Sequence, residues 1–139
     1  MEWFRDDYVI STDRNLLQLD VIHGFLTTAY WCAGRCMETV KVSIENSECL
    51  GLYHAGKQVG FMRMVTDYAT MYWLCDVFVI EAYRGRGLAK WMMTCLMEHP
   101  VLGKLNGFLS TTHAHGLYRQ FGYEVHPNPQ KMMIVRPVP

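Results

Sequence analysis

Residues 76–89, Asp-Val-Phe-Val-Ile-Glu-Ala-Tyr-Arg-Gly-Arg-Gly-Leu-Ala, decide the fold. An apolar strand is expected to end near Ile80, and a loop with two glycines opens directly into a helix. Glycine has no Cβ, so an anion can approach the loop backbone closely. The first amides of a helix have no intrahelical partner, and the helix dipole adds partial positive charge. The stretch therefore predicts a pyrophosphate site, with Arg84 and Arg86 adding charge at its edge.

Two other nucleotide-binding loops do not fit these letters. A P-loop requires G-x-x-x-x-G-K-[ST], which the chain lacks. A dinucleotide fingerprint requires G-x-G-x-x-G and an acidic residue about twenty positions later. Lys90 stands in place of the third glycine, and residues 103–107 read Gly-Lys-Leu-Asn-Gly.

The strand that leads into this loop, residues 70–80, is apolar on both faces and carries one charge, Asp76. A strand of this kind belongs in the middle of a sheet that helices cover on both faces.

Hydrophobic spacing and turn residues predict the other elements of one α/β (α+β) domain over residues 1–139, antiparallel in its first half. The further strands are expected over residues 8–11, 49–54, 58–66 and 107–112, with a last strand or hairpin over 123–125 and 132–135. The helices are expected over residues 15–30, 37–46, 87–98 and 114–121.

Two motifs carry a family resemblance. Arg84, Gly87 and Ala89 fill the pattern [RQ]-x-x-G-x-[GA], and residues 114–123, Ala-His-Gly-Leu-Tyr-Arg-Gln-Phe-Gly-Tyr, match A-x-x-L-Y-x-x-x-G-[FY]. On both, the chain resembles the GNAT superfamily of acetyltransferases, and among them a group of small, single-domain, bacterial-type proteins. The resemblance covers nearly the whole chain. It implies a mixed, mostly antiparallel sheet, splayed at the cofactor site and flanked by helices on both faces.

The resemblance also implies acetyl-CoA as cofactor, with the pantetheine arm on the strand backbone and the pyrophosphate on the loop amides. The cofactor-binding residues implied in this way are Phe78, Val79, Arg84, Gly85, Arg86, Gly87, Leu88 and Ala89.

Tyr118 matches the tyrosine of the family motif, which the resemblance makes the proton donor to the departing thiolate. A phenol with a pKa near 10 stays protonated at neutral pH and can donate a proton. The alternative is that Tyr118 only continues an apolar stripe with Leu117 and Phe121.

Asp76 is the candidate general base, because a carboxylate in an apolar strand is costly unless it is paired or used. It could equally be a structural group tied to a backbone amide or an arginine. His23, His113 and His115 remain open as alternative bases. An acyl-enzyme route through Cys75 or Cys95 is disfavoured, because neither cysteine has an evident activating partner.

The acceptor is expected to be a primary amine of a small molecule or amino acid. Tyr30, Trp31 and Tyr72 are the candidate substrate-binding residues, whereas Trp73 is interpreted as a core residue. The sequence contains no acidic patch that would favour a polyamine as the acceptor. The rival function is a non-catalytic acyl-CoA sensor with the same fold; Tyr118 favours the enzyme.

Composition excludes other classes of partner. Thirteen basic and thirteen acidic side chains are scattered, and give no clustered charge for a nucleic acid. No uncharged run is long enough to span a bilayer. Five cysteines without framework spacing indicate free thiols in a reducing compartment and no metal site. We therefore predict a soluble cytoplasmic protein, and a homodimer stays open.

Overall fold

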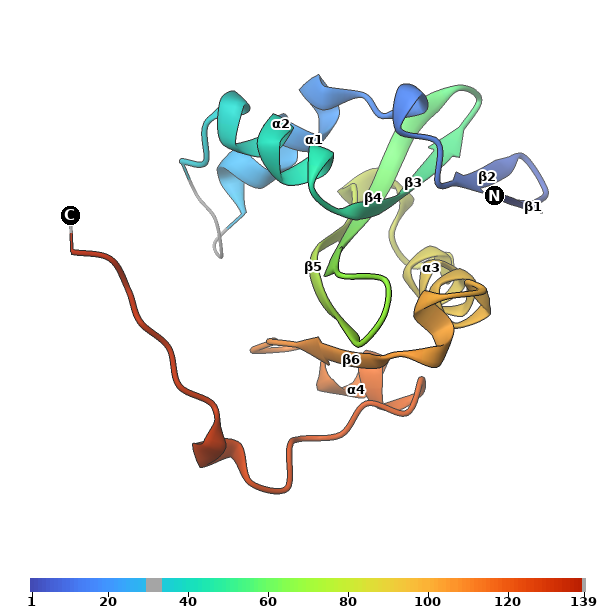
Figure 1. Cartoon of the computed structure of the whole chain (residues 1–139). Helices are drawn as coiled ribbons and strands as arrows, with labels where there is room; N and C mark the ends of the chain where they lie inside the picture. Colours follow the sequence, from blue (N-terminus) through green and yellow to red (C-terminus); the bar gives the residue numbers. More distant parts are fainter. Residues whose placement is uncertain (30–33, 139) are drawn as a thin grey trace.

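The computed structural model describes residues 1–29 and 34–138 and contains one six-stranded sheet whose strands follow chain order (Figure 1). The first five strands pair antiparallel, and the last one lies parallel to its neighbour. The strands are β1 (Glu2–Arg5), β2 (Tyr8–Ser11), β3 (Glu48–His54), β4 (Lys57–Thr66), β5 (Met71–Val79) and β6 (Asn106–Leu109).

Helices cover both faces of this sheet, as the sequence predicts. Side chains of α1 and α2 share one buried cluster with Phe61 and Phe78, and side chains of α3 share the other with Met62 and Leu74. The helices are α1 (Leu19–Thr28), α2 (Met37–Glu45), α3 (Leu88–Glu98) and α4 (His115–Arg119). Short 3-10 turns occupy Arg14–Leu16, Glu81–Tyr83, Leu102–Lys104 and Pro129–Lys131. The predicted α/β class and mixed sheet are therefore confirmed.

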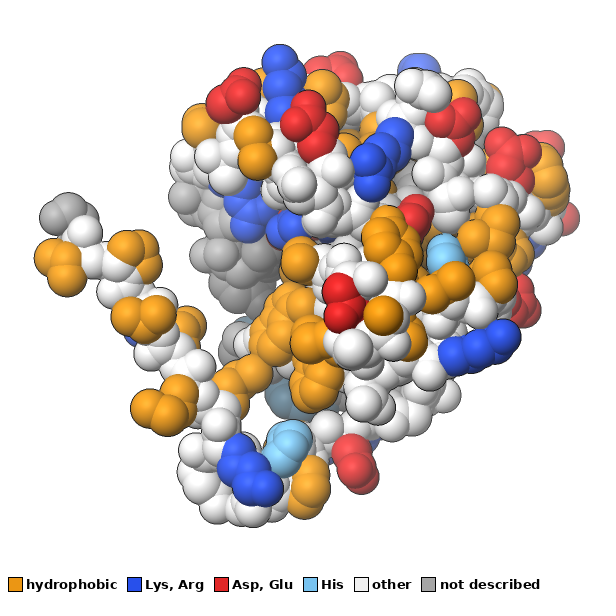
Figure 2. All heavy atoms as spheres, in the orientation of Figure 1, with side chains coloured by type: hydrophobic (Ala, Val, Ile, Leu, Met, Phe, Trp, Pro, Cys, Tyr) orange, Lys and Arg blue, Asp and Glu red, His pale blue; other side chains and the backbone are white. Residues whose placement is uncertain are grey.

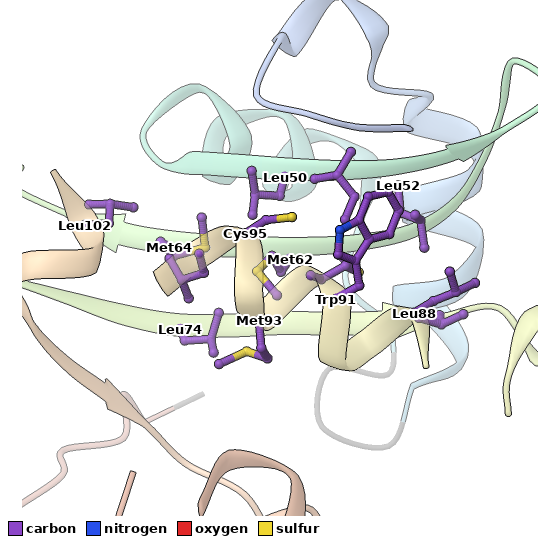
Figure 3. Close-up of a cluster of buried hydrophobic side chains, with 14 of the residues drawn as sticks. Leu50, Leu52, Met62, Met64, Leu74, Leu88, Trp91, Met93, Cys95 and Leu102 are labelled. Carbon is purple, nitrogen blue, oxygen red and sulfur yellow. The ribbon is translucent and has the colours of Figure 1, made fainter. Parts of the chain in front are cut away.

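The larger buried cluster fixes the start of α3. Cys95 and Trp91 point from this helix toward Leu50 and Leu52 of β3, and Met93 points toward Leu74 of β5 (Figure 3). Burying an apolar side chain of this size contributes about 1.5–3 kcal/mol relative to leaving it exposed. The N-terminus of α3 is therefore held at a fixed place beside the end of β5.

A bulge in β5 changes the face of the sheet toward which its alternate side chains point. The register runs from Phe61↔Phe78 to Arg63↔Cys75, so β5 has one residue more than β4 between these pairs. Asp76 takes this extra position with a φ of 53°. Alternation then shifts by one residue, because a bulge breaks the period of two. As a result Leu74 packs under α3, whereas Phe78 packs under α1 and α2.

The sheet opens beyond the bulge. β5 pairs with β6 only from Met71↔Asn106 to Leu74↔Leu109, so the part of β5 after Leu74 has no strand on that side. The two parallel strands diverge from this point, which is the predicted splay.

Several predicted boundaries are wrong. The helix expected over 15–30 is a 3-10 turn followed by α1, the last parallel strand ends at Leu109, and β1 was not expected. No strand forms over 123–125 or 132–135. Pro127 and Pro129 lie in the connection between these two segments, where their fixed φ restricts the turns that the chain can make, and the chain after residue 126 runs away from the body (Figure 1).

Among the described residues, no helix is both long and apolar enough for a membrane span. The same residues contain no group of three or more side chains suited to hold a metal ion.

Candidate active site

A cavity of about 400 Å³ lies at the start of α3. It is formed where β5 ends, the glycine loop turns and the helix begins, with one wall from α4. Its lining residues are Val79, Tyr83, Arg84, Gly85, Gly87, Leu88, Ala89, Lys90 and Leu117.

The loop backbone has the conformation that an anion site requires. Gly85 and Gly87 have φ values of 78° and 72°, a left-handed region that favours glycine. Gly87 is the N-cap of α3 and offers no side-chain acceptor to the first amides of the helix. Those amides and the helix dipole therefore face the cavity with positive partial charge.

The two loop arginines have different contacts. Arg84 donates from Nε to the carbonyl oxygen of Val79 at 2.9 Å. Its amide donates to the carbonyl oxygen of Glu81 at 3.1 Å. Arg86 donates to the hydroxyl of Tyr8 at 2.9 Å and lies over the ring of Tyr83. Both arginine side chains are exposed, so their charge stays at the rim.

Phe78 and Val79 separate at the end of β5. Val79 lines the cavity, whereas the ring of Phe78 stacks on Phe25 with 4.0 Å between centroids and is buried on the opposite face. Any contact of Phe78 with the predicted cofactor would therefore use its backbone.

A second cavity of about 360 Å³ occupies the space between the diverging strands β5 and β6. We call it the strand cleft. Its lining residues are Arg35, Arg63, Trp73, Leu74, Cys75, Asp76, Val77, Leu109, Ser110, Thr111, Thr112, Ala114 and Tyr118.

Asp76 is paired with two arginines in this cleft. Its Oδ2 accepts from Nη1 of Arg35 and from Nε of Arg63, each at 2.8 Å. Arg63 also donates from Nη1 to Oγ of Ser47 at 3.0 Å. The Asp76 side chain is 2% exposed, against 21% for Arg35. Of the two interpretations left open by the sequence, the structure contains the arginine pairing.

Tyr118 reaches the cleft from α4. Its ring meets Tyr123 edge to face at 5.9 Å, and the amide of Leu117 donates to the carbonyl of Ala114, which starts the short helix. Leu117 and Tyr118 line the first and second cavity respectively, so α4 forms a shared wall.

Cys75 lines the cleft as a thiol. Burial raises its pKa to about 11, despite the opposing charge of Arg63. The thiolate fraction is therefore small at neutral pH, and a thiol is a weak nucleophile.

The predicted acceptor residues fall in different places. Tyr30 and Trp31 lie outside the described residues. Tyr72 is 2% exposed and its hydroxyl hydrogen-bonds Tyr123, so its side chain belongs to the core and not to the cleft. Trp73, interpreted from sequence as core, is half-buried, lines the cleft and stacks with Phe108.

Arg35 and Arg63 were not among the predicted site residues. A signal for Arg63 was present, because it is the one charge within residues 58–66, as Asp76 is within 70–80. Two opposite charges in neighbouring apolar strands indicate a pair. Arg35 has no comparable signal, because Gly34 places it in an irregular segment before α2.

Comparisons with known proteins agree with this geometry. A family model described as acetyltransferase (GNAT) domain matches residues 45–125. A solved structure from Xanthomonas campestris pv. campestris, assigned to the GNAT family, is 40% identical, covers 95% of this chain and 94% of that one, and has a TM-score of 0.89.

Two further proteins are similar to this chain. The spermine/spermidine N(1)-acetyltransferase of Bacillus subtilis strain 168 is 33% identical, and the match covers 70% of this chain and 80% of that protein. A GNAT family acetyltransferase from Elizabethkingia anophelis, solved with acetyl-CoA bound, is 12% identical and covers 88% of this chain and 79% of that one. Its TM-score is 0.66, a likeness of fold.

Proposed function

The chain belongs to the GNAT family of acetyltransferases, and we propose that it moves an acetyl group from acetyl-CoA to a primary amine of a small molecule by direct transfer. The observation that carries this proposal is that two cavities meet at α4. One has the features of an anion site at a helix N-terminus, and the other holds Tyr118 between the diverging strands.

The residues of the first cavity fit the phosphate part of acetyl-CoA. Gly85 and Gly87 leave the backbone open, and the uncapped start of α3 supplies amide donors. The exposed arginines of the loop add positive charge at the rim. Acetyl-CoA supplies the activated acetyl group, and the chain has to hold it so that the thioester end reaches the strand cleft.

Tyr118 is the proposed general acid. Direct transfer leaves a thiolate, which departs more readily when a neutral donor protonates it. The Tyr118 side chain is half-buried and lines the strand cleft, where it shares a wall with the first cavity. General acid catalysis of this kind contributes typically about 10²–10⁴-fold to a rate.

Asp76 is proposed as a positioning residue. Its carboxylate accepts from Arg35 and Arg63 at one oxygen and thereby holds both guanidinium groups at the cleft. A role as general base remains the competing hypothesis, and the two roles predict different pH dependence of turnover.

Direct transfer is favoured over an acyl-enzyme. Cys75 is the described cysteine that lines the cleft, and its raised pKa keeps it protonated. A protonated thiol would need a base, and the nearby carboxylate of Asp76 is already shared by two arginines.

The competing function is an acyl-CoA sensor that binds without transfer. A thiol-release assay with acetyl-CoA and a panel of amines and amino acids separates the two functions. We expect amine-dependent release of coenzyme A thiol and an acceptor whose mass increases by one acetyl group. Tight binding of acetyl-CoA without release across the panel would favour the sensor.

A further inference from the structure

The strand cleft has the wrong charge for a polyamine. Its described lining contains two cationic side chains, Arg35 and Arg63, against the single carboxylate of Asp76. One carboxylate balances one guanidinium, so the cleft keeps an excess of one positive charge. A polyamine would place further ammonium groups beside this charge, and like charges in a partly buried site repel each other.

Of the two arginines that pair with Asp76, Arg35 is the one better placed to bind a ligand. Arg63 uses Nε for Asp76 and Nη1 for Ser47, and its side chain is 12% exposed. Arg35 contributes one nitrogen to Asp76 and its side chain is 21% exposed. A planar guanidinium with donors left over is suited to bind a carboxylate through two hydrogen bonds.

We propose that the acceptor is an amine that also carries a carboxylate, as an amino acid does, and that Arg35 binds this carboxylate. The inference rests on the proposed transfer to an amine. In this arrangement Asp76 holds the Arg35 guanidinium against the cleft wall. Ser110 and Thr111 line the same cleft, and Oγ1 of Thr111 accepts a hydrogen bond from the amide of Ala114 at 3.0 Å.

Pairs of amines that differ only in the carboxylate test this proposal. Leucine and isopentylamine form one pair, and phenylalanine and phenethylamine form a second. Hydrogen bonds to a charged group are stronger than neutral ones, so we expect kcat/KM, expressed per concentration of neutral amine, to be at least about 10-fold higher for the amino acids. Spermidine is the third arm and is expected to be the poorest acceptor.

The variant Arg35→Gln removes the charge and keeps a polar side chain. We expect it to lower kcat/KM for the amino acid about 10-fold or more, mainly through KM, and thereby to remove most of the difference between the two members of each pair. Arg35→Lys should restore part of the difference. The control is Lys41→Gln, which removes an exposed cation from α2. Melting temperature and acetyl-CoA binding are measured for each variant, so that loss of folding is recognised.

Equal turnover of both members of each pair, or a preference for spermidine, would overturn the carboxylate proposal while the acetyltransferase proposal stands. A chain that binds acetyl-CoA and acetylates no amine overturns the transfer proposal and this inference with it.

A second inference comes from the C-terminal segment, residues 132–138. It is extended, separate from the body and rich in apolar side chains, which Figure 2 shows as a projecting row. Met133 is 92% exposed, Ile134 76% and Val135 90%. Exposing this much contiguous apolar surface to water is unfavourable and marks an interaction site.

The same chain contains a strand edge that this segment could cover. β6 is the last strand of the sheet and, within residues 1–29 and 34–138, pairs on one side only, with β5. An unpaired edge presents free amides and carbonyls to another chain. The sequence of residues 132–135, Met-Met-Ile-Val, is suited to a strand, and in this structure it points away from its own β6 (Figure 1).

We infer that residues 132–135 pair with the free edge of β6 in a second copy of the chain, which makes a homodimer. Light scattering after size exclusion tests this on the full chain and on a chain that ends at His126. We expect about twice the 16.2 kDa chain mass for the first and a monomer for the second. The full-length variant Ile134→Asp/Val135→Asp, which charges both faces of the segment, is also expected to be monomeric and does not depend on the shortened chain folding.

A full chain that is monomeric at every concentration, or a dimer that survives both changes, would overturn the homodimer proposal.

Discussion

Leu117 and Tyr118 are neighbours in α4, and each lines a different cavity. Leu117 faces the cavity at the N-terminus of α3, and Tyr118 faces the cleft between β5 and β6. A one-turn helix thus lies where the proposed cofactor site meets the proposed reaction site. This adjacency gives each cavity a separate experimental readout, acetyl-CoA binding for the first and turnover for the second.

Gly87→Val should remove acetyl-CoA binding. Acetyl-CoA is expected to raise the melting temperature of the parent, because a ligand that binds only the native state stabilises it. Valine at a φ of 72° is strained by about 1–3 kcal/mol, and its side chain would occupy the space over the first helix amides. We therefore expect a lower melting temperature and no shift with acetyl-CoA.

The matched control is Gly56→Val. Gly56 has a φ of 77° in the turn between β3 and β4, so the strain is similar, but it does not line the cavity. This variant should keep the acetyl-CoA shift. A shift that survives in Gly87→Val would place the phosphates elsewhere.

Asp76→Asn should weaken the fold more than it weakens acetyl-CoA binding. It leaves two guanidinium groups without their shared carboxylate, and removing one partner of a buried polar pair costs about 1–3 kcal/mol. Chemical denaturation measures this loss, with Asp20→Asn, an exposed change on α1, as the control. Should kcat/KM instead fall mostly at low pH while stability is unchanged, Asp76 acts as the base.

The cysteines should differ in reactivity. Cys36 is exposed, and a hydrogen bond with Thr39 lowers its pKa. Burial raises the pKa of Cys75 to about 11 and that of Cys95 to about 12. Mapping of iodoacetamide adducts at neutral pH should therefore find Cys36 modified before Cys75 and Cys95. Incubation with acetyl-CoA should add no acetyl group to Cys75; an acetyl group found there would indicate an acyl-enzyme.

His99 should make stability fall in mild acid. Its Nδ1 accepts from the amides of Val101 and Leu102, and burial lowers its pKa below the ordinary 6.5. The native state thus favours the neutral ring, so its contribution is present above pH 6.5 and is lost as pH falls toward the lower native pKa. The free energy of unfolding should drop less steeply in His99→Asn than in the parent, and His126→Asn should behave as the parent does. Parallel curves for His99→Asn and the parent would contradict this role.

The conformation of the proposed cofactor loop could be predicted from the sequence because its determinants are local. Gly85, Gly87 and the helix after them follow one another along the chain, and their geometry depends on nearest neighbours. The apolar strand before them indicated where the sheet is buried. The loop conformation and the burial of this strand can both be predicted without knowing the order of the strands in the sheet.

The acceptor half could not be predicted in the same way. The bulge at Asp76 exists only as a difference in register between β4 and β5, and a sequence pattern does not contain register. That shift moves Phe78 to the α1 side, and Arg35 arrives at Asp76 from a position 41 residues earlier. The sequence analysis placed Tyr72 at the acceptor and Trp73 in the core, whereas in the structure Tyr72 is buried and Trp73 lines the cleft. The two residues are adjacent and both aromatic, so only the packing under α3 decides which one is buried.

The measurement that tests the central claim most directly is kcat of the parent and of Tyr118→Phe, at saturating acetyl-CoA and amine. The substitution removes one oxygen and keeps the ring against Tyr123, so folding and acetyl-CoA binding should be retained. We predict a kcat about 10²-fold lower, at the lower end of the range for general acid catalysis, because water can partly replace a phenol. A Phe variant as fast as the parent would contradict the assignment of Tyr118 as the acid.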